Sequence, residues 1–246
     1  MLYNTLKTAI RQIYKNKGFA FINILGLAVG LACSFLILLH VVTELSYDKH
    51  FNDAENIYRL AVKSSMGENQ FEAAVTGGPL AQTLQNELPE VLSHTRIREG
   101  RMTLLNSGDK AFYEENILFA DSNFFELFNY ELLRGDPDEV LKKPKSLVLS
   151  DKMAEKFFGE VDPIGQQIKW NNDENYTVTA VFKESPDKSH LHFNILVSFS
   201  TLYQNERFKT IALIWFTYTT LNYIKVHEMD PVVLEIEIAG VCKIYG

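Results

Sequence analysis

An uncharged, apolar segment near the N-terminus constrains the fold most strongly. No Asp, Glu, Lys or Arg occurs from Gly18 to Thr43, and the stretch from Phe19 to Val42 is a run of 24 residues. As a helix this run would be about 36 Å long, against a hydrocarbon thickness of about 30 Å for a bilayer. It is longer than the apolar core of a cleaved signal peptide, and no convincing small-x-small cleavage pattern follows it. The sequence therefore predicts an uncleaved transmembrane helix over residues 18–43.

Charge is distributed unevenly around this segment. Four of the 24 basic residues and none of the 31 acidic residues lie within the first 43 positions. The positive-inside rule then places the N-terminus in the cytoplasm and the rest of the chain outside it. The acidic excess beyond residue 43 argues against a nucleic-acid partner, which would require a basic face. The two cysteines, Cys33 and Cys242, do not form a disulfide framework.

Small or weakly polar residues recur at three- and four-residue steps along the predicted helix. They share one face, and they are Asn23, Gly26, Gly30, Cys33 and Ser34. Such a face allows a second helix backbone to approach closely, so it predicts packing against another membrane helix. The alternative is that glycine is simply common in membrane helices.

Residues 1–17 show a second helical pattern. Apolar residues at helical spacing form one stripe, namely Leu2, Leu6, Ala9, Ile10 and Ile13. The cations of this segment lie off that stripe or follow it, and they are Lys7, Arg11, Lys15 and Lys17. This pattern predicts an amphipathic helix on the cytoplasmic surface of the membrane, in contact with lipid. A basic tail that only sets the orientation of the chain is an equally good interpretation.

Residues 44–226 show short strand patterns and a few helices without regular βαβ alternation, which predicts a mixed α+β domain. The predicted strands are residues 57–62, 71–76, 91–98, 102–106, 112–120, 146–149, 167–170, 176–182, 195–199 and 217–226. The predicted helices are residues 79–88, 122–128 and 152–158, and residues 171–173 form a predicted hairpin turn. Residues 135–144, rich in Asp, Pro and Lys, are the best candidate for a boundary between two lobes, and residues 227–246 form a C-terminal tail.

Motifs for chemistry are weak in this chain. The sequence contains no G-x-x-x-x-G-K-[ST] loop, G-x-S-x-G elbow or H-E-x-x-H helix, so it predicts no catalytic, cofactor or metal residues. His190 and His192, with Asp187 nearby, could ligate a metal, although a histidine pair of this kind is more often structural. Gly77 and Gly78 before a predicted helix favour a turn over an anion site. Four aromatic residues favour a core role over a ligand site, namely Phe124, Phe125, Phe128 and Tyr130.

Several segments, taken in their order and spacing, resemble the N-terminal part of MacB/FtsX-type ABC transporter permeases. These segments are residues 16–19, 23–30, 44–48, 56–60, 121–125, 133–137, 157–159, 162–165 and 189–191. The resemblance covers nearly the whole chain. It implies a membrane helix followed by a MacB-like periplasmic core domain, in a permease of the bacterial inner membrane.

The family resemblance also implies partners and a mode of action. Such permeases work with a separate cytoplasmic ATPase and couple ATP hydrolysis to export or extraction of a substrate. A second permease copy is the expected membrane partner. Family members carry three further membrane helices after the periplasmic domain, whereas residues 227–246 contain no apolar run near 20 residues. The sequence is therefore expected to be a truncated permease or a fragment of one.

Two other function classes fit the same residues. One is a single-pass, membrane-tethered binding or sensor module without transport activity. The other is an anchored hydrolase that uses scattered residues such as Asp187, His190 and His192. Screening the domain for hydrolysis would test the second class, and no turnover is expected.

Overall fold

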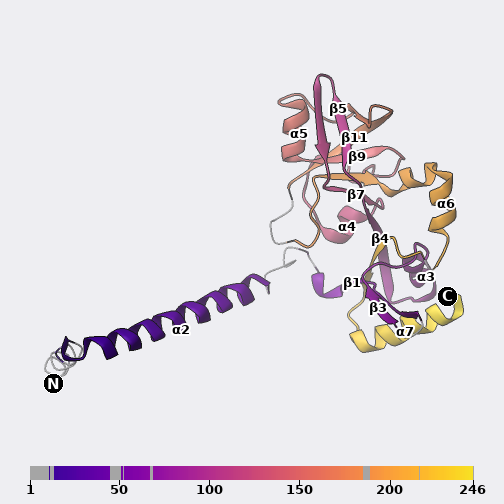
Figure 1. Ribbon diagram of the computed structural model, residues 1–246. Helices are drawn as coiled ribbons and strands as arrows, with labels where there is room; N and C mark the ends of the chain where they lie inside the picture. The colour runs from indigo at the N-terminus through magenta and orange to yellow at the C-terminus, as the bar shows by residue number, and fades with distance from the viewer. Residues whose placement is uncertain are drawn as a thin grey trace. The chain divides into compact units, whose positions relative to one another are not determined.

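The computed structural model describes residues 11, 14–44, 51, 53–66, 69–184, 189–215 and 217–245. The chain divides into two compact units, Met1–Tyr47 and Asp48–Gly246. Figure 1 shows the two units and labels many of their helices and strands. Each unit is described by itself below.

The first unit contains one long helix, α2 (Lys17–Glu44), of 28 residues. Among the described residues it is the one helix long and apolar enough to cross a membrane, and none of its side chains is buried. Two hydroxyl side chains donate hydrogen bonds inside the helix, Ser34 Oγ to the Gly30 carbonyl oxygen at 2.9 Å and Thr43 Oγ1 to the Leu39 carbonyl oxygen at 2.8 Å. Internal satisfaction of polar groups is what a lipid environment demands. The predicted helix is confirmed.

The second unit is built on an 11-stranded mixed sheet, with strand order β1-β13-β4-β7-β12-β9-β11-β10-β5-β6 and β8 paired to β11. Its strands are β1 (Ile57–Arg59), β4 (Val91–Glu99), β5 (Thr103–Ser107), β6 (Lys110–Glu114), β7 (Ile117–Ala120), β8 (Leu132–Gly135), β9 (Ser146–Ser150), β10 (Gln167–Trp170), β11 (Glu174–Phe182), β12 (Ile195–Ser198) and β13 (Leu221–Val226). A separate hairpin is formed by β2 (Val62–Met66) and β3 (Asn69–Ala73).

The centre of the large sheet is completely covered. Every residue of β9 and β12 is buried, as expected for strands with near-continuous apolar sequences. The pairs β7–β12 and β9–β11 are parallel, and the other pairs of this sheet are antiparallel. The mixed α+β class predicted from the sequence is therefore confirmed.

Short helices cover the sheet and complete three apolar clusters. The helices are α3 (Leu80–Glu87), α4 (Phe124–Phe128), α5 (Asp151–Phe158), α6 (Glu206–Ala212) and α7 (Pro231–Tyr245), and the 3-10 helices are η1 (Ala54–Asn56) and η2 (Phe199–Gln204). Helix α4 contributes to the first cluster, α5 to the second, and α3 and α7 to the third. Figure 1 shows α5 near β5, β9 and β11, and α3 and α7 at the opposite end of this unit.

Several predicted elements match the structure closely. Ser150 caps α5, because its hydroxyl oxygen accepts a hydrogen bond from the Met153 backbone N–H at 3.3 Å. The predicted turn at residues 171–173 joins β10 to β11, and its residues Asn171 and Asn172 have φ values of 52° and 63°. Asparagine tolerates this left-handed region better than most residues, which explains the turn chemistry.

Other predictions were wrong. The single strand predicted over residues 112–120 is two strands, β6 and β7, which belong to different parts of the sheet. The chain turns between them because Glu114 Oε1 accepts hydrogen bonds from the Asn116 backbone N–H at 3.0 Å and from Asn194 Nδ2 at 3.1 Å. Strand β8 and helices η2, α6 and α7 had no counterpart in the prediction. Helix α7 lies in the segment predicted only as a tail.

Residues 135–144 do not divide the domain. Val140 and Leu141 from this segment are buried in the first apolar cluster. Ser198 Oγ also donates a hydrogen bond to the Leu141 carbonyl oxygen at 2.6 Å. Residues 48–246 form one compact unit, so the Pro- and Lys-rich composition marks a loop packed on the core instead of a boundary between lobes.

Candidate functional site

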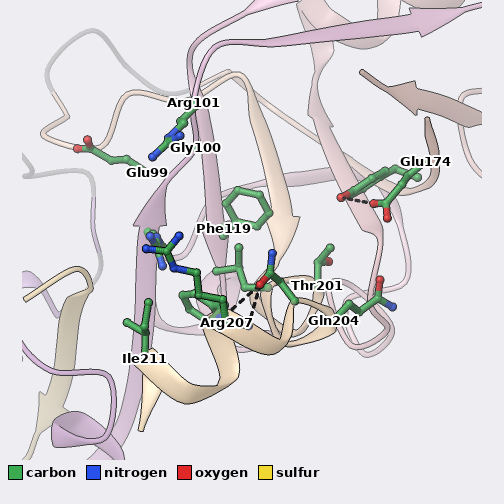
Figure 2. A pocket seen from close by; sticks show the side chains of 14 residues that line it. Glu99, Gly100, Arg101, Phe119, Glu174, Thr201, Gln204, Arg207 and Ile211 are labelled. Carbon is green, nitrogen blue, oxygen red and sulfur yellow. Dashed lines mark hydrogen bonds between the residues drawn. The ribbon is translucent and has the colours of Figure 1, made fainter. Parts of the chain in front are cut away.

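A sizeable cavity of the domain lies beside the end of β4. It has a volume of about 710 Å³ and is lined by residues from β4, β7, β11, η2 and α6. The lining residues are Arg98, Glu99, Gly100, Arg101, Phe119, Glu174, Tyr176, Thr201, Leu202, Gln204, Asn205, Arg207, Phe208 and Ile211. Figure 2 shows Glu99 and Arg101 at one end of this cavity, Arg207 and Ile211 on α6, and Glu174 on the side away from Arg101. We call it the arginine cavity.

Local sequence explains how α6 reaches the arginine cavity. Asn205 caps this helix, because its side-chain oxygen accepts hydrogen bonds from the backbone N–H groups of Arg207 at 2.9 Å and Phe208 at 3.3 Å. The cap holds the first turn, so Arg207 and Phe208 both line the cavity. On the facing side, the Gly100 backbone N–H donates to the Ile117 carbonyl oxygen at 2.8 Å. A Cβ at Gly100 would lie 3.0 Å from Ile117, so a glycine fits this approach of the two strands best.

Arg98 is held against an aromatic ring. Its guanidinium carbon lies 4.8 Å from the centre of the Phe208 ring, a cation–π distance. Its Nη1 atom is buried and has no hydrogen-bond partner among the described residues. Burial lowers the pKa of Arg98, and the nearby charge of Arg101 acts in the same direction. The guanidinium is therefore held in a place where a negative charge would stabilise it.

The acidic residues of the arginine cavity differ in their pairing. Glu174 accepts a hydrogen bond from the Tyr176 hydroxyl at 3.4 Å, and its Oε1 lies 3.4 Å from Lys145 Nζ. Burial, with Glu174 acting in the same direction, raises the pKa of Tyr176. The side chain of Glu99 is exposed at the rim. Among the described residues Lys145 pairs with Glu174 and no cation pairs with Glu99, so the three arginines of the lining give the cavity an excess of positive charge.

The predicted helix-packing face has a definite place in the structure. Asn23, Gly26, Gly30, Cys33 and Ser34 all lie in α2 and are exposed. A Cβ placed at Gly26 or Gly30 would meet no atom within 4 Å. Packing of this face against another helix stays a prediction.

The predicted cytoplasmic cations lie at the start of the chain. Lys7 lies outside the described residues, whereas Arg11, Lys15 and Lys17 have helical backbone and exposed side chains. Lys17 is the first residue of α2. Their contact with a membrane surface stays a prediction.

The residues of the weaker candidate sites lie in different surroundings. His190 Nε2 lies 2.9 Å from the Tyr223 hydroxyl, His192 is exposed, and Asp187 lies outside the described residues. The described part of the chain holds no group of three or more His, Cys, Asp or Glu side chains suited to a metal ion. Among the four aromatic residues predicted to be core, Phe124, Phe128 and Tyr130 are buried in the first cluster and Phe125 packs against it.

Gly77 and Gly78 are explained by close backbone contact. A Cβ at Gly77 would lie 2.1 Å from the Trp215 carbonyl oxygen, and one at Gly78 would lie 2.7 Å from the Ala212 carbonyl oxygen. The Gly77 carbonyl oxygen accepts a hydrogen bond from Asn222 Nδ2 at 3.0 Å. Gly77 and Gly78 therefore allow two segments of the chain to approach closely, in agreement with the turn predicted there.

Sequence reasoning missed the arginine cavity. Its arginines come from residues 98–101 and from 207, which are distant in the chain. The only available signal was the Arg-Ile-Arg-Glu-Gly-Arg sequence of residues 96–101, a basic cluster within an acidic domain. No sequence pattern could show that Arg207 joins it.

Comparison with known proteins assigns the fold. The chain is similar to a domain of a protein described as a permease from Porphyromonas gingivalis, with 19% identity over 80% of this chain and 84% of that one, at a TM-score of 0.71. It is similar to the periplasmic region of MacB from Actinobacillus actinomycetemcomitans, with 16% identity over 81% and 87% of the two chains, at a TM-score of 0.56.

A third similar structure is the extracellular domain of the noncanonic ABC-type transporter YknZ from Gram-positive bacteria. It shares 15% identity over 73% of this chain and 88% of that one, at a TM-score of 0.51. A search among curated proteins gives no match. The family described as the MacB-like periplasmic core domain matches residues 20–228, which include most of α2 and all strands of the domain. This chain belongs to the family of MacB-like periplasmic core domains.

Proposed function

We propose that this chain is a permease subunit, or the N-terminal part of one, of an ABC transporter in the bacterial inner membrane. The observation that carries the proposal is the single family match from residue 20 to residue 228, which joins an apolar helix to a MacB-like domain. In this proposal the domain lies in the periplasm and changes conformation during export or extraction of a substrate.

The proposal assigns ATP hydrolysis to a separate cytoplasmic subunit. The sequence contains no G-x-x-x-x-G-K-[ST] loop, whose backbone amides would hold the phosphates of ATP. Arg11, Lys15 and Lys17, together with Lys7, supply the positive charge expected on the cytoplasmic side. These cations would contact lipid head groups and lie close to the ATPase.

The small-residue face of α2 supports a partner inside the membrane. Gly26 and Gly30 leave open space beside the helix, and close backbone approach is the main source of helix association in lipid. We assign this face to another permease helix or to a second copy of the chain.

The arginine cavity favours one alternative, a single-pass membrane-tethered binding or sensor module without transport activity. A ligand cavity on a tethered domain needs no ATPase. The two functions therefore differ in the partner that they require.

Purification from native membranes separates these functions. A tagged copy of the gene product is extracted in a neutral detergent and its partners are identified by mass spectrometry. The permease proposal expects a nucleotide-binding subunit in stoichiometric amount. A preparation that keeps its folded domain but never contains an ATPase, even after mild cross-linking in cells, contradicts the proposal and supports the tethered module.

A further inference from the structure

We infer that the arginine cavity binds a small ligand that carries a phosphate monoester beside an apolar group. Arg98, Arg101 and Arg207 hold the anion, and Phe208 with Ile211 contacts the apolar part. This inference concerns ligand binding by the domain and does not depend on the transport proposal.

The guanidinium of Arg98 has a buried nitrogen, Nη1. Buried polar atoms nearly always have a hydrogen-bond partner, and an unsatisfied one carries a cost of about 1–3 kcal/mol. Nη1 of Arg98 is buried without such a partner among the described residues, and Arg98 is one of the residues that line the cavity. A ligand oxygen that reaches this guanidinium supplies an acceptor that the described residues do not.

The arginine cavity carries an excess of positive charge. The guanidinium groups of Arg101 and Arg207 form no ion pair with any described residue, and both side chains are exposed at the cavity. Arg98 forms none either, and its neighbour Arg101 disfavours its charge. The chain as a whole is acidic, whereas three arginines line this cavity. Counted over the described lining residues, with Glu174 balanced by Lys145, three arginines and Glu99 give a local excess of two positive charges, which suits a dianion.

The cations of the cavity have the hydrogen-bonding geometry that phosphate groups require. All three are arginines, whose planar guanidinium forms paired hydrogen bonds with phosphate or carboxylate oxygens. A phosphate monoester near neutral pH is close to a dianion and offers three acceptor oxygens. A single carboxylate would leave one positive charge uncompensated. The cavity therefore favours a phosphate monoester over a monocarboxylate.

The size and the apolar lining of the arginine cavity suit a small ligand with an apolar part. A volume of about 710 Å³ lies within the range of small-molecule sites, about 300–1,000 Å³. Phe119, Phe208 and Ile211 give the cavity apolar surface next to the arginines. Inorganic phosphate alone would leave this surface in contact with water, so a ligand with an apolar part binds more tightly.

Titration calorimetry on the full-length chain in a neutral maltoside detergent tests the inference. The probes are phenyl phosphate, inorganic phosphate, benzoate and dihexanoyl phosphatidic acid. Phenyl phosphate is expected to bind at least about tenfold more tightly than inorganic phosphate and benzoate, a difference of about 1.4 kcal/mol. If the short-chain lipid binds more tightly than phenyl phosphate, the source of the anion is a lipid head group, and if it binds less tightly, the source is a soluble metabolite.

Substitutions in the cavity test whether these arginines bind the phosphate ligand. Arg207→Gln changes an exposed side chain on α6 and is expected to weaken phenyl phosphate binding about tenfold. Arg98→Lys keeps the charge but loses the paired donors, and it is expected to weaken binding by a similar factor. Arg134→Gln, at an exposed position outside the cavity lining, is the matched control and should leave the affinity unchanged.

Two results would overturn the inference. One is the absence of binding by any phosphate probe at 10 mM ligand, a concentration about tenfold above a 1 mM dissociation constant. The other is binding that Arg207→Gln leaves unchanged, or that Arg134→Gln weakens equally, because the affinity would then reflect general charge. Thermal unfolding of each variant shows whether the domain is intact, and Arg207→Gln keeps the test valid if Arg98→Lys unfolds.

Discussion

Arg96 on β4 and Asp121 at the end of β7 form a two-pronged ion pair. Nε and Nη2 of the guanidinium donate to Oδ2 and Oδ1 of the carboxylate, each at 2.8 Å. The same guanidinium lies 4.5 Å from the centre of the Phe199 ring and donates to the Tyr203 hydroxyl at 2.9 Å. Burial opposes the charge of Arg96, but Asp121 and Tyr203 outweigh it and raise its pKa. This pair therefore joins two strands to η2, the segment beneath the arginine cavity.

Loss of the Asp121 carboxylate is expected to destabilise the domain. Asp121→Ala leaves a mostly buried guanidinium without its partner, because the two side chains are only 16% and 20% exposed. We expect a loss of about 3 kcal/mol in the free energy of unfolding, measured by urea denaturation. Asp162→Ala is the control, since its pair with Arg134 is 3.5 Å long and exposed. Its expected loss is below about 1 kcal/mol, and an equal loss in both variants would contradict the role given to Asp121.

Gly77 is expected to tolerate no side chain. Gly77→Ala places a methyl group 2.1 Å from the Trp215 carbonyl oxygen, so the backbone must move. The expected destabilisation is about 2 kcal/mol or more, seen as a lower midpoint of thermal unfolding. Gly240→Ala is the contrasting change, because no atom lies within 4 Å of its Cβ position in α7. That variant should be neutral or stabilised by up to about 1 kcal/mol. A Gly77→Ala variant with unchanged stability would contradict the close approach of the Trp215 carbonyl oxygen to Gly77.

His94 is expected to make stability depend on pH. Burial lowers its pKa, with Arg96 in the same direction and Asp121 opposing. Its Nδ1 lies 2.5 Å from Gln85 Oε1. The unfolded chain therefore binds more protons than the folded chain below about pH 6.5, so stability falls as the pH decreases through this range.

Replacing His94 tests this dependence. His94→Gln removes the titrating ring and should flatten the dependence of the unfolding free energy on pH between about 7 and 5. His192→Gln, at an exposed position, is the matched control and should keep the slope of the parent chain. A slope unchanged by His94→Gln would show that another group causes the acid sensitivity.

The small-residue face of α2 is expected to promote helix association. Gly26→Leu with Gly30→Leu adds bulk where the helix itself has free space, so a loss of association reports on a partner. A membrane dimerisation reporter should show a several-fold lower signal. Ala28→Leu with Ala32→Leu adds comparable bulk to the opposite face and should keep the signal. An equal signal in both double variants would contradict the assignment of the Gly26 and Gly30 face to a helix interface.

The elements that the sequence predicted well carry strong local signals. The apolar run of α2, the buried strands β9 and β12, and the turn at Asn171 and Asn172 each depend on neighbouring residues. The missed elements lack such signals. Glu235 and Glu237 interrupt the apolar pattern of α7, although Leu234 and Val241 pack in the third cluster.

The arginine cavity could not be predicted for a different reason. It combines the end of β4 with η2 and α6, which follow about a hundred residues later. Only the three-dimensional arrangement brings the guanidinium of Arg98 against the Phe208 ring and leaves its Nη1 without an acceptor among the described residues. Local patterns of charge and hydrophobicity contain no information on such long-range pairings.

Membrane topology tests the central claim most directly. In a chain with Cys33→Ser and Cys242→Ser, a single cysteine is placed at Asp109, an exposed turn between β5 and β6, or at Lys15 before α2. Bacterial cells with a permeabilised outer membrane are then treated with a membrane-impermeant maleimide. The account predicts that Asp109→Cys is labelled in intact cells and Lys15→Cys only after lysis. Labelling in the reverse order, or recovery of the intact chain in the soluble cytosol, would contradict it.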